Sequence, residues 1–368
     1  MKLLFVIKGL VIEGGGAERV FVDVANAMAR KGHDVVIATF DRPEGALFYD
    51  VEEDVSVHRL GTGKPGLPTP RRSVAVTMAR LRKLAASLHP DVAIGFMHST
   101  YVPMTFSLLG TGIPLVLSEH ASLAYFADKP LQRALVNLVH RQSYAKTVVS
   151  EAIRREHPAE RQARVVVLPN PVAIGQFSAN IRATPQARIL CVGGLREEKG
   201  HDTLIAAFDA IAADHPDWHL RIVGDGATRP KIEALLSTTI HADRIELAGI
   251  IRDVMPEYGQ AAFTVVPSRN ESLSLVAVES MASGRPVIGF ADCAGPAALI
   301  DDGENGVLVD PGSDRTAALA GAMDAMIRDE DRRQRMGRVA PATVAQFSAE
   351  NVISAWEDLL HSASKSRG

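Results

Sequence analysis

Short apolar runs alternate with longer stretches of mixed polarity along this chain, and turn residues separate them. Such runs predict β-strands, and the stretches between them predict helices. Strands that alternate with helices favour a parallel, doubly wound α/β sheet. In the first half the predicted strands are Leu3–Ile7, Asp34–Thr39, Val55–Arg59, Val92–Phe96, Leu115–Ser118, Thr147–Ser150 and Val165–Leu168, with helices that include Ala17–Lys31 and Ser73–Leu88.

The second half repeats this plan after a break at Asn170–Pro185, which we interpret as an interdomain linker. Two doubly wound domains that face each other would leave a cleft lined by the carboxyl ends of both sheets, where ligands bind in such folds. The predicted strands here are Arg188–Val192, His219–Val223, Ile245–Leu247, Phe263–Val266, Pro286–Gly289 and Gly306–Val309, with helices that include Asp202–Asp214, Leu275–Ser283 and a terminal stretch, Ala349–His361.

Composition supports two domains and a reducing compartment. The chain has 368 residues, 46% of them hydrophobic, which suits two cores of ordinary size. Its only cysteines, Cys191 and Cys293, lie in apolar stretches and cannot form a disulfide framework. Only five consecutive apolar residues precede Lys8, too few for a secretory signal, and no run approaches the roughly 18 apolar residues of a membrane span. We expect a soluble, cytoplasmic protein.

Charge differs between the two parts. Residues 1–178 carry 21 Lys and Arg against 16 Asp and Glu, whereas the remainder carries 19 against 27. This asymmetry hints that the first part faces an anionic partner.

A glycine-rich turn, Gly14-Gly15-Gly16, joins the first strand to the first helix. Glycines let the backbone approach a ligand, and a helix N-terminus offers free N–H groups to an anion. A dinucleotide fingerprint would need glycine where Arg19 stands, and no P-loop motif occurs, which disfavours nicotinamide and P-loop enzymes. A merely tight turn remains the alternative.

The corresponding loop of the second half is Val192–Gly200, with Gly193 and Gly194 followed by Arg196 and Lys199. A guanidinium fork and an ammonium point charge suit a diphosphate and can stabilise it as a leaving group. The alternative is that both cations pair with Glu197 and Glu198 on a solvated turn.

The segment Pro267–Ile288 places Glu271 in a polar loop and Glu279 inside an apolar helix, where a carboxylate is costly to bury without a partner. Glu279 could accept hydrogen bonds from ribose hydroxyls, and the helix N-terminus near Ser274 could meet phosphate. The alternatives are a structural ion pair for Glu279 and a solvated loop for Glu271.

His120 follows an apolar strand, although a lone histidine is more often structural than catalytic. No His, Cys and Asp cluster has metal-ligand spacing, so no structural zinc is expected.

Taken together, these residues resemble a family 4 retaining glycosyltransferase of the GT-B fold, over nearly the whole chain. Five features occur in the family's order. They are the Gly-Gly-Ala-Glu-Arg turn, His120, Asn170-Pro171, the Val-Gly-Gly-Leu-Arg-x-x-Lys-Gly loop and the Glu271/Glu279 pair, and Ile222–Gly226 and Gly249 also match. The resemblance implies domains at residues 1–174 and 175–349, with 350–368 crossing back onto the first.

The resemblance also implies roles. His120, Glu271, Arg196 and Lys199 would be catalytic, and no divalent metal or cofactor would be needed. A UDP-sugar, or else a GDP-sugar, would be the sugar donor. Its sugar would be transferred with retention, by departure and attack on the same face, guided by the leaving phosphate. Domain closure would complete the site. The implied residues of the sugar-donor site are Gly15, Gly16, Arg196, Lys199, Gly249, Ile251, Arg252, Glu271, Ser274, Leu275 and Glu279.

The chain departs from the family pattern at two places. Ser272-Leu273-Ser274 replaces a glycine-containing triplet, so serine side chains could narrow the sugar pocket, and Ala298 stands where many members have glutamate. Three rival functions remain: a glycoside hydrolase, which needs two carboxylates about 5–5.5 Å apart across the bond if it is retaining, a nucleotide-sugar epimerase, and a non-catalytic nucleotide-sugar-binding subunit.

The acceptor is expected to be a glycan, a lipid-linked saccharide or a small molecule, and not nucleic acid. Gly61–Pro70 is predicted as a flexible or lid-like loop. It leads into Arg71–Leu88, where an apolar stripe lies beside basic residues. Such a helix could rest weakly on anionic lipid at the inner face of the membrane, whereas the alternative is that the stripe packs on the core. The stripe comprises Val74, Met78, Leu81, Leu84 and Leu88.

Overall fold

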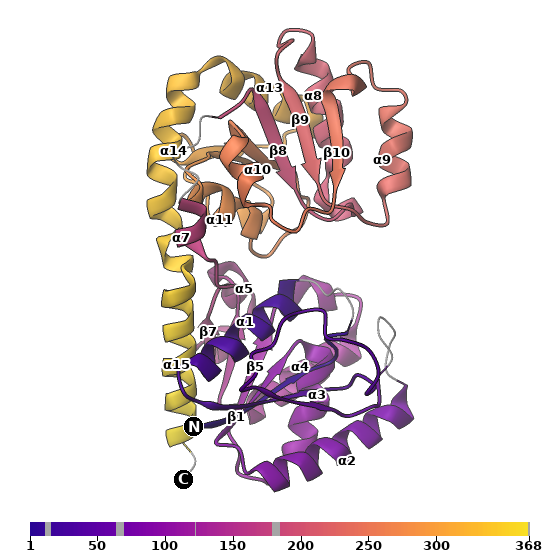
Figure 1. Cartoon of the computed structure of the whole chain (residues 1–368), viewed down its shortest axis with the longest axis vertical. Coiled ribbons are helices and arrows are strands. Elements are labelled where there is room, and N and C mark those ends of the chain that lie inside the picture. The colour runs from indigo at the N-terminus through magenta and orange to yellow at the C-terminus, as the bar shows by residue number, and fades with distance from the viewer. Residues whose placement is uncertain (12–15, 64–69, 122, 179–184, 367–368) are drawn as a thin grey trace. The chain divides into compact units, whose positions relative to one another are not determined.

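Two parallel sheets, each flanked by helices, make up the chain (Figure 1). The computed structural model describes residues 1–11, 16–63, 70–121, 123–178 and 185–366. The chain folds as two compact units, Met1–Pro171 with Glu350–Gly368, and Val172–Ala349. The sequence predicts this boundary after residue 174. Val172 goes with the second unit because it pairs with Ser348.

The first sheet has seven parallel strands in the order β3-β2-β1-β4-β5-β6-β7. They are β1 (Lys2–Ile7), β2 (Asp34–Thr39), β3 (Ser56–Arg59), β4 (Val92–Phe96), β5 (Leu115–Glu119), β6 (Ala145–Val148) and β7 (Val165–Val167). Its helices are α1 (Gly16–Arg30), α2 (Arg71–Leu88), α3 (His98–Leu108), η1 (Leu123–Phe126), α4 (Pro130–Gln142), α5 (Glu151–Glu156), α6 (Ala159–Gln162) and α15 (Ala349–Lys365).

The second sheet has six parallel strands in the order β10-β9-β8-β11-β12-β13. They are β8 (Arg188–Val192), β9 (His219–Val223), β10 (Ile245–Gly249), β11 (Phe263–Val266), β12 (Val287–Phe290) and β13 (Gly306–Val309). Its helices are α7 (Ile174–Ser178), η3 (Glu197–Lys199), α8 (His201–Ala212), α9 (Arg229–Leu236), η4 (Ala242–Arg244), α10 (Met255–Gln260), α11 (Leu275–Ala282), α12 (Ala294–Ala297), α13 (Arg315–Arg328), α14 (Glu330–Val344) and η5 (Ala345–Phe347).

Apolar side chains cover both faces of the first sheet, as expected for strands that read as continuous apolar runs. On one face Phe96 stacks on Trp356 of α15, with ring centroids 5.7 Å apart and ring planes 16° apart. Trp356 is fully buried, so α15 is part of this unit's core.

Several predicted elements are shifted by one or two residues, and two segments show larger differences. β6 begins at Ala145, two residues before the predicted start, and it carries Lys146 fully buried. The expected linker Asn170–Pro185 contains helix α7, whose Phe177 is buried. The glycines Gly14 and Gly15 and most of the predicted lid, residues 64–69, lie outside the described residues.

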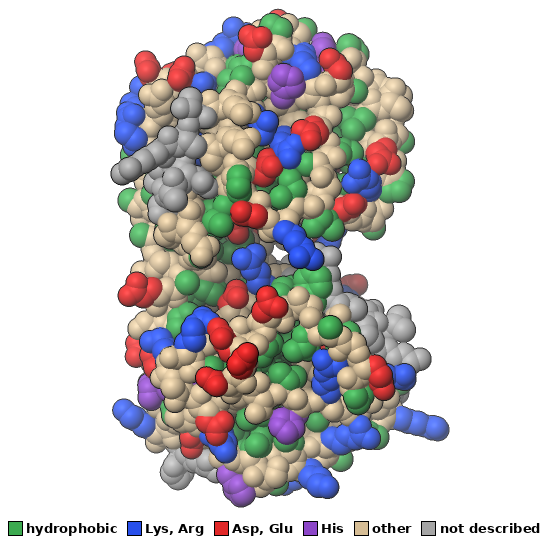
Figure 2. Space-filling model, viewed as in Figure 1, with side chains coloured by type: hydrophobic (Ala, Val, Ile, Leu, Met, Phe, Trp, Pro, Cys, Tyr) green, Lys and Arg blue, Asp and Glu red, His purple; other side chains and the backbone are tan. Residues whose placement is uncertain are grey.

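Helix α2 packs its apolar stripe on the core. Leu81 is fully buried and Leu84 and Leu88 pack beside it. Arg80 donates to the Leu60 carbonyl, and Arg82 donates to the Ser107 carbonyl at 2.9 Å. These leucines are therefore covered, whereas α2 exposes Arg72, Arg80, Arg82 and Lys83 together with the apolar Val76. Lys and Arg side chains are blue and hydrophobic ones green in Figure 2. Among the described helices, none has the length and apolar character needed to span a membrane.

Candidate active site

The loops that carry the predicted chemistry lie at the carboxyl edge of the second sheet. Because all six strands are parallel, the loops that follow them emerge at the same edge. The strand order reverses between β8 and β11, and ligands of doubly wound sheets bind at this switch point. Lys199 follows β8 and Glu271 follows β11, so the two predicted residues flank it.

Lys199 and Glu271 meet across the switch point. The Lys199 Nζ donates to Glu271 Oε1 at 2.5 Å, and the two side chains are 24% and 12% exposed. The other oxygen, Oε2, is buried and has no hydrogen-bond partner among the described residues. This carboxylate therefore keeps an acceptor for a ligand hydroxyl, and the ammonium keeps two of its three donors.

The alternative in which Arg196 and Lys199 pair with their acidic neighbours is wrong. Glu197 instead accepts from Lys231 at 2.9 Å, and Lys199 binds Glu271. The Arg196 side chain is exposed, and no hydrogen bond or ion pair holds it within the described ranges. Its guanidinium is thus available to an anion.

Close backbone packing fixes the loop that carries these cations. The Leu195 N–H donates to the Asp225 carbonyl at 3.0 Å. A Cβ at Gly226 would stand 2.5 Å from the Leu195 carbonyl oxygen, and one at Gly224 would stand 2.1 Å from the Gly193 oxygen. Only glycine fits at either position, which explains why the segment Ile222–Gly226 matched the family pattern.

Arg269 ties the loop after β11 to the start of α8. Its guanidinium donates to both oxygens of Asp202 at 2.9 Å and to the Thr203 hydroxyl at 3.0 Å. A further bond of 2.7 Å goes to the Glu197 carbonyl. Sequence reasoning missed this residue, because only the fold brings its partners together.

The backbone of Glu271 is held by Gly295, whose role the sequence pattern does not predict. The Gly295 N–H donates to the Glu271 carbonyl at 2.7 Å, and a Cβ at Gly295 would stand 3.0 Å from that oxygen. Ala298, which departs from the family pattern three residues later, is exposed at the end of α12.

Ser274 is the N-terminal cap of helix α11. Its hydroxyl accepts from the Ala277 N–H at 3.3 Å, and the residue is fully buried. The hydroxyl of this serine is therefore engaged by the helix that it caps. The N–H groups of Leu275 and Val276 lie in the first helical turn, where a helix has no carbonyl of its own for them.

Glu279 is positioned by Tyr258. The Tyr258 hydroxyl donates to Glu279 Oε2 at 2.8 Å. Burial, and then the Glu279 charge, raises the pKa of Tyr258 well above its usual value, so the hydroxyl stays protonated. Phe177 of α7 packs edge-on against the Tyr258 ring, at 5.8 Å between centroids. Sequence reasoning missed both aromatic residues.

The segment Gly249–Arg252 begins at the carboxyl end of β10, beside the loop after β9. Gly249 has φ of 71° and accepts from the Gly224 N–H at 2.8 Å. Ile251 is half-buried and Arg252 is exposed. These residues share the carboxyl edge of the second sheet with Lys199 and Glu271.

Both cysteines are buried, free thiols. Burial raises the pKa of Cys191 to about 12 and that of Cys293 to about 11. Both thiols are therefore protonated and unsuited to act as nucleophiles at neutral pH.

His120 stands at the carboxyl end of β5 in the first unit. Its ring stacks on Phe96 at 5.4 Å between centroids, and Nε2 lies 3.2 Å from the Ser118 hydroxyl. Burial lowers its pKa to about 4, so the imidazole is neutral at pH 7 and can exchange hydrogen bonds with hydroxyls. The buried Glu119 accepts from the His120 N–H at 3.0 Å and holds this strand end. Gly16, also predicted, begins α1.

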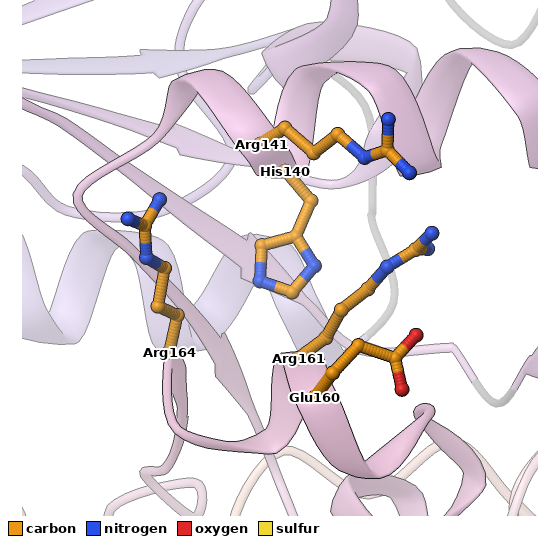
Figure 3. A pocket seen from close by; sticks show the side chains of 5 residues that line it. All are labelled: His140, Arg141, Glu160, Arg161 and Arg164. Carbon is orange, nitrogen blue, oxygen red and sulfur yellow. The ribbon is translucent and has the colours of Figure 1, made fainter.

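A basic pocket lies in the first unit, at the opposite edge of its sheet from His120 (Figure 3). Its volume is about 310 Å³. His140 lies near the end of α4, which precedes β6, and Arg164 directly precedes β7, so the pocket is at the amino edge of the sheet. His120 is at the carboxyl edge, which excludes the pocket from its site. The lining residues are His140, Arg141, Glu160, Arg161 and Arg164.

Comparison with known proteins identifies the class. A family model described as Glycosyltransferase Family 4 matches residues 14–176, and one described as Glycosyl transferases group 1 matches residues 186–329. The structure of Anabaena Alr3699/HepE in complex with UDP superposes with a TM-score of 0.81 at 20% identity, covering 98% of this chain and 100% of that one. The fold is that of the GT-B glycosyltransferases.

Sequence relatives extend over the same length. A Haemophilus influenzae protein described as an uncharacterized glycosyltransferase is 25% identical, covering 94% of this chain and 96% of that protein. A Campylobacter jejuni enzyme is 26% identical, with 98% of each chain covered. Its name is GalNAc-α-(1→4)-GalNAc-α-(1→3)-diNAcBac-PP-undecaprenol α-1,4-N-acetyl-D-galactosaminyltransferase. The chain belongs to the family 4 glycosyltransferases.

Proposed function

We propose that this glycosyltransferase moves a hexose-type sugar from a nucleoside-diphosphate sugar to an acceptor hydroxyl, with retention and without a divalent metal. The observation that supports this best is the contact of Lys199 with Glu271 across the switch point of the second sheet. It places a cation for a phosphate beside a carboxylate oxygen that has no partner in the described structure.

The other proposed residues account for the rest of the sugar donor. Arg196 and Lys199 bind the diphosphate, aided by the first N–H groups of α11. Glu279, positioned by Tyr258, accepts hydrogen bonds from the ribose. The segment 249–252 borders the base. Glu271 orients hydroxyls of the sugar, and the neutral His120 hydrogen-bonds another sugar hydroxyl.

The proposed reaction needs no base from the protein. The bond between the anomeric carbon and the β-phosphate oxygen breaks, and Arg196 and Lys199 stabilise the charge that develops on the leaving diphosphate. The acceptor oxygen forms its bond to the anomeric carbon on the same face, and its proton passes to the leaving phosphate oxygen. The products are the glycoside and a nucleoside diphosphate.

UDP is the favoured nucleotide of the sugar donor. Family frequency supports it, and the Anabaena protein was solved with UDP. A glycan or lipid-linked acceptor is supported by the Campylobacter relative, whose name includes a PP-undecaprenol-linked saccharide.

We place the enzyme in the cytoplasm, with the basic residues of α2 in weak contact with anionic lipid at the inner face of the membrane.

An assay of nucleotide release tests the proposal. The full chain is incubated in EDTA with UDP-glucose, UDP-N-acetylglucosamine, UDP-galactose or GDP-mannose, alone and with a pool of glycan and lipid-linked acceptors. We expect release of one nucleoside diphosphate that depends on an acceptor, and an α-linked product by NMR. An epimerase would convert the sugar donor without acceptor, a binding subunit would release nothing, and a product of inverted configuration would contradict retention.

A further inference from the structure

Two residues of the terminal helix face a histidine from the start of the first sheet. Glu357 and His361 stand four residues apart on α15, so they lie on the same side of the helix. His33 precedes β2, and its Nε2 lies 3.2 Å from Glu357 Oε1. The ligand-type atoms of His33, Glu357 and His361 all lie within 4.8 Å of one another. All three residues belong to the first unit.

We propose that His33, Glu357 and His361 form a binding site for a divalent transition-metal ion of the Zn²⁺ type. Two imidazoles and one carboxylate are a donor set that Zn²⁺ takes up, with water as a fourth ligand. The site uses none of the residues proposed for glycosyl transfer and does not depend on them.

The observed spacing is close to what a tetrahedral ion requires. Ligands at about 2.0–2.1 Å from the ion are separated by roughly 3.3 Å. The contact between His33 Nε2 and Glu357 Oε1 is 3.2 Å. Two imidazoles on one tetrahedral ion have ring centroids roughly 5 Å apart. The rings of His33 and His361 are 5.6 Å apart and inclined by 70°. His361 is exposed, so its ring has room to reorient toward the other two ligands.

The groups next to His33 and Glu357 bind their other polar atoms and leave His33 Nε2 and Glu357 Oε1 directed toward each other. The His33 Nδ1 lies 3.4 Å from the Met1 amino group, so Nε2 is the nitrogen directed to the ion. Lys31 donates to the other oxygen of Glu357, Oε2, at 2.7 Å. The lysine holds the carboxylate in place but also opposes a second cation. Removal of its charge should therefore strengthen metal binding.

An ion at this position would cross-link α15 to the turn between α1 and β2. The helix returns to this unit from the far end of the chain, since Glu357 lies 324 positions after His33. Trp356, next to Glu357, packs in the core of the unit, so a bound ion would stabilise an interface that already exists. Metal binding should raise the thermal stability of the first unit.

The test is titration of the tag-free full chain with Zn²⁺ by calorimetry, and with Co²⁺ by visible absorption. We expect one ion per chain, a Co²⁺ spectrum of four-coordinate type, and no comparable binding of Mg²⁺. H33Q and H361Q should each weaken binding by at least about 100-fold, because loss even of an outer-shell partner costs 10–100-fold. H58Q, on an exposed histidine of the same unit, is the matched control.

A second variant gives an effect of opposite sign. K31Q should tighten Zn²⁺ binding about tenfold, the effect of a unit charge roughly 5 Å from a divalent ion in water. K83Q, on an exposed lysine of α2 in the same unit, should leave it unchanged. Absence of Zn²⁺ binding, binding unaffected by H33Q and H361Q, or no gain from K31Q would each overturn the proposal.

Discussion

Lys199 and Glu271 stand 72 residues apart in the chain, yet their side chains join the loops on the two sides of the switch point. The sequence predicts both residues as ligands of a sugar donor, because each lies in a polar loop after an apolar strand. It could not predict that they bind each other, since that contact follows from the adjacency of β8 and β11. Nor could it predict Tyr258 and Arg269, whose partners come from distant segments.

Lys199→Ala should lower kcat by about 10²–10³-fold, as does loss of one preorganised donor to a developing negative charge in other enzymes. Steady-state kinetics with the preferred sugar donor measure this. Lys231→Ala is the control, because Lys231 is an exposed lysine that binds Glu197 at 2.9 Å, and kcat should stay within about twofold. Equal losses in both variants would mean that Lys199 acts only through the general charge of this edge.

Tyr258→Phe should raise KM for the sugar donor by about 3–10-fold and leave kcat nearly unchanged. The hydroxyl positions Glu279, whose proposed contacts are to the ribose and not to the reacting carbon. The substrate complex and the transition state should therefore lose the same binding free energy, about 1 kcal/mol. A fall in kcat with KM unchanged would contradict the ribose assignment.

The loops after β8 and β9 pack closely against each other. Their backbones come so close at Gly224 and Gly226 that no larger residue fits. Gly226→Ala should destabilise the second unit by about 1–3 kcal/mol, because its Cβ would stand 2.5 Å from the Leu195 carbonyl oxygen and backbone would have to move. Chemical denaturation followed by Trp218 fluorescence measures this.

Gly321→Ala is the matched control for that change. Gly321 lies inside helix α13, and nothing comes within 4 Å of a Cβ there. Alanine should therefore stabilise the second unit by about 0.5–1 kcal/mol. Destabilisation by both substitutions to a similar extent would show that the loop packing is not the cause.

The strands with mostly apolar residues could be predicted with correct bounds. β4, β8 and β11 have the predicted bounds, since apolar residues dominate each of them. The sequence predicts β6 two residues late because Lys146 interrupts its apolar run, although this lysine is fully buried and its charge interacts with Glu119. The sequence does not predict helix α7, because its five residues are too few to show a repeating helical pattern of apolar positions.

Buried histidines give the chain as a whole an acid-sensitive stability. Burial lowers the pKa of His140 to about 4, of His157 to about 3 and of His201 to about 4. In the unfolded chain these groups titrate near the ordinary histidine pKa of about 6.5, so unfolding takes up protons below that pH. The free energy of unfolding should therefore fall as pH drops from about 6.5 to 4, by up to about 1.4 kcal/mol per pH unit for each histidine.

Thermal unfolding across this pH range measures the effect. His157→Gln removes one titrating group and should reduce the slope of stability against pH, whereas His219→Gln, at an exposed position, should not. A stability that is flat between about pH 6.5 and 4, or a slope that His157→Gln leaves unchanged, would contradict the assignment of neutral buried histidines.

The central claim is that the carboxyl edge of the second sheet binds a nucleoside diphosphate through the cations after β8 and through Glu279. Thermal unfolding with UDP, GDP, ADP and NAD, each alone and without added metal, tests it most directly. At 100 times its dissociation constant a ligand adds about 2.7 kcal/mol. We predict such a gain with one nucleoside diphosphate, and its loss in Glu279→Gln. No gain with any diphosphate, a gain with NAD alone, or a gain that Glu279→Gln leaves intact would contradict it.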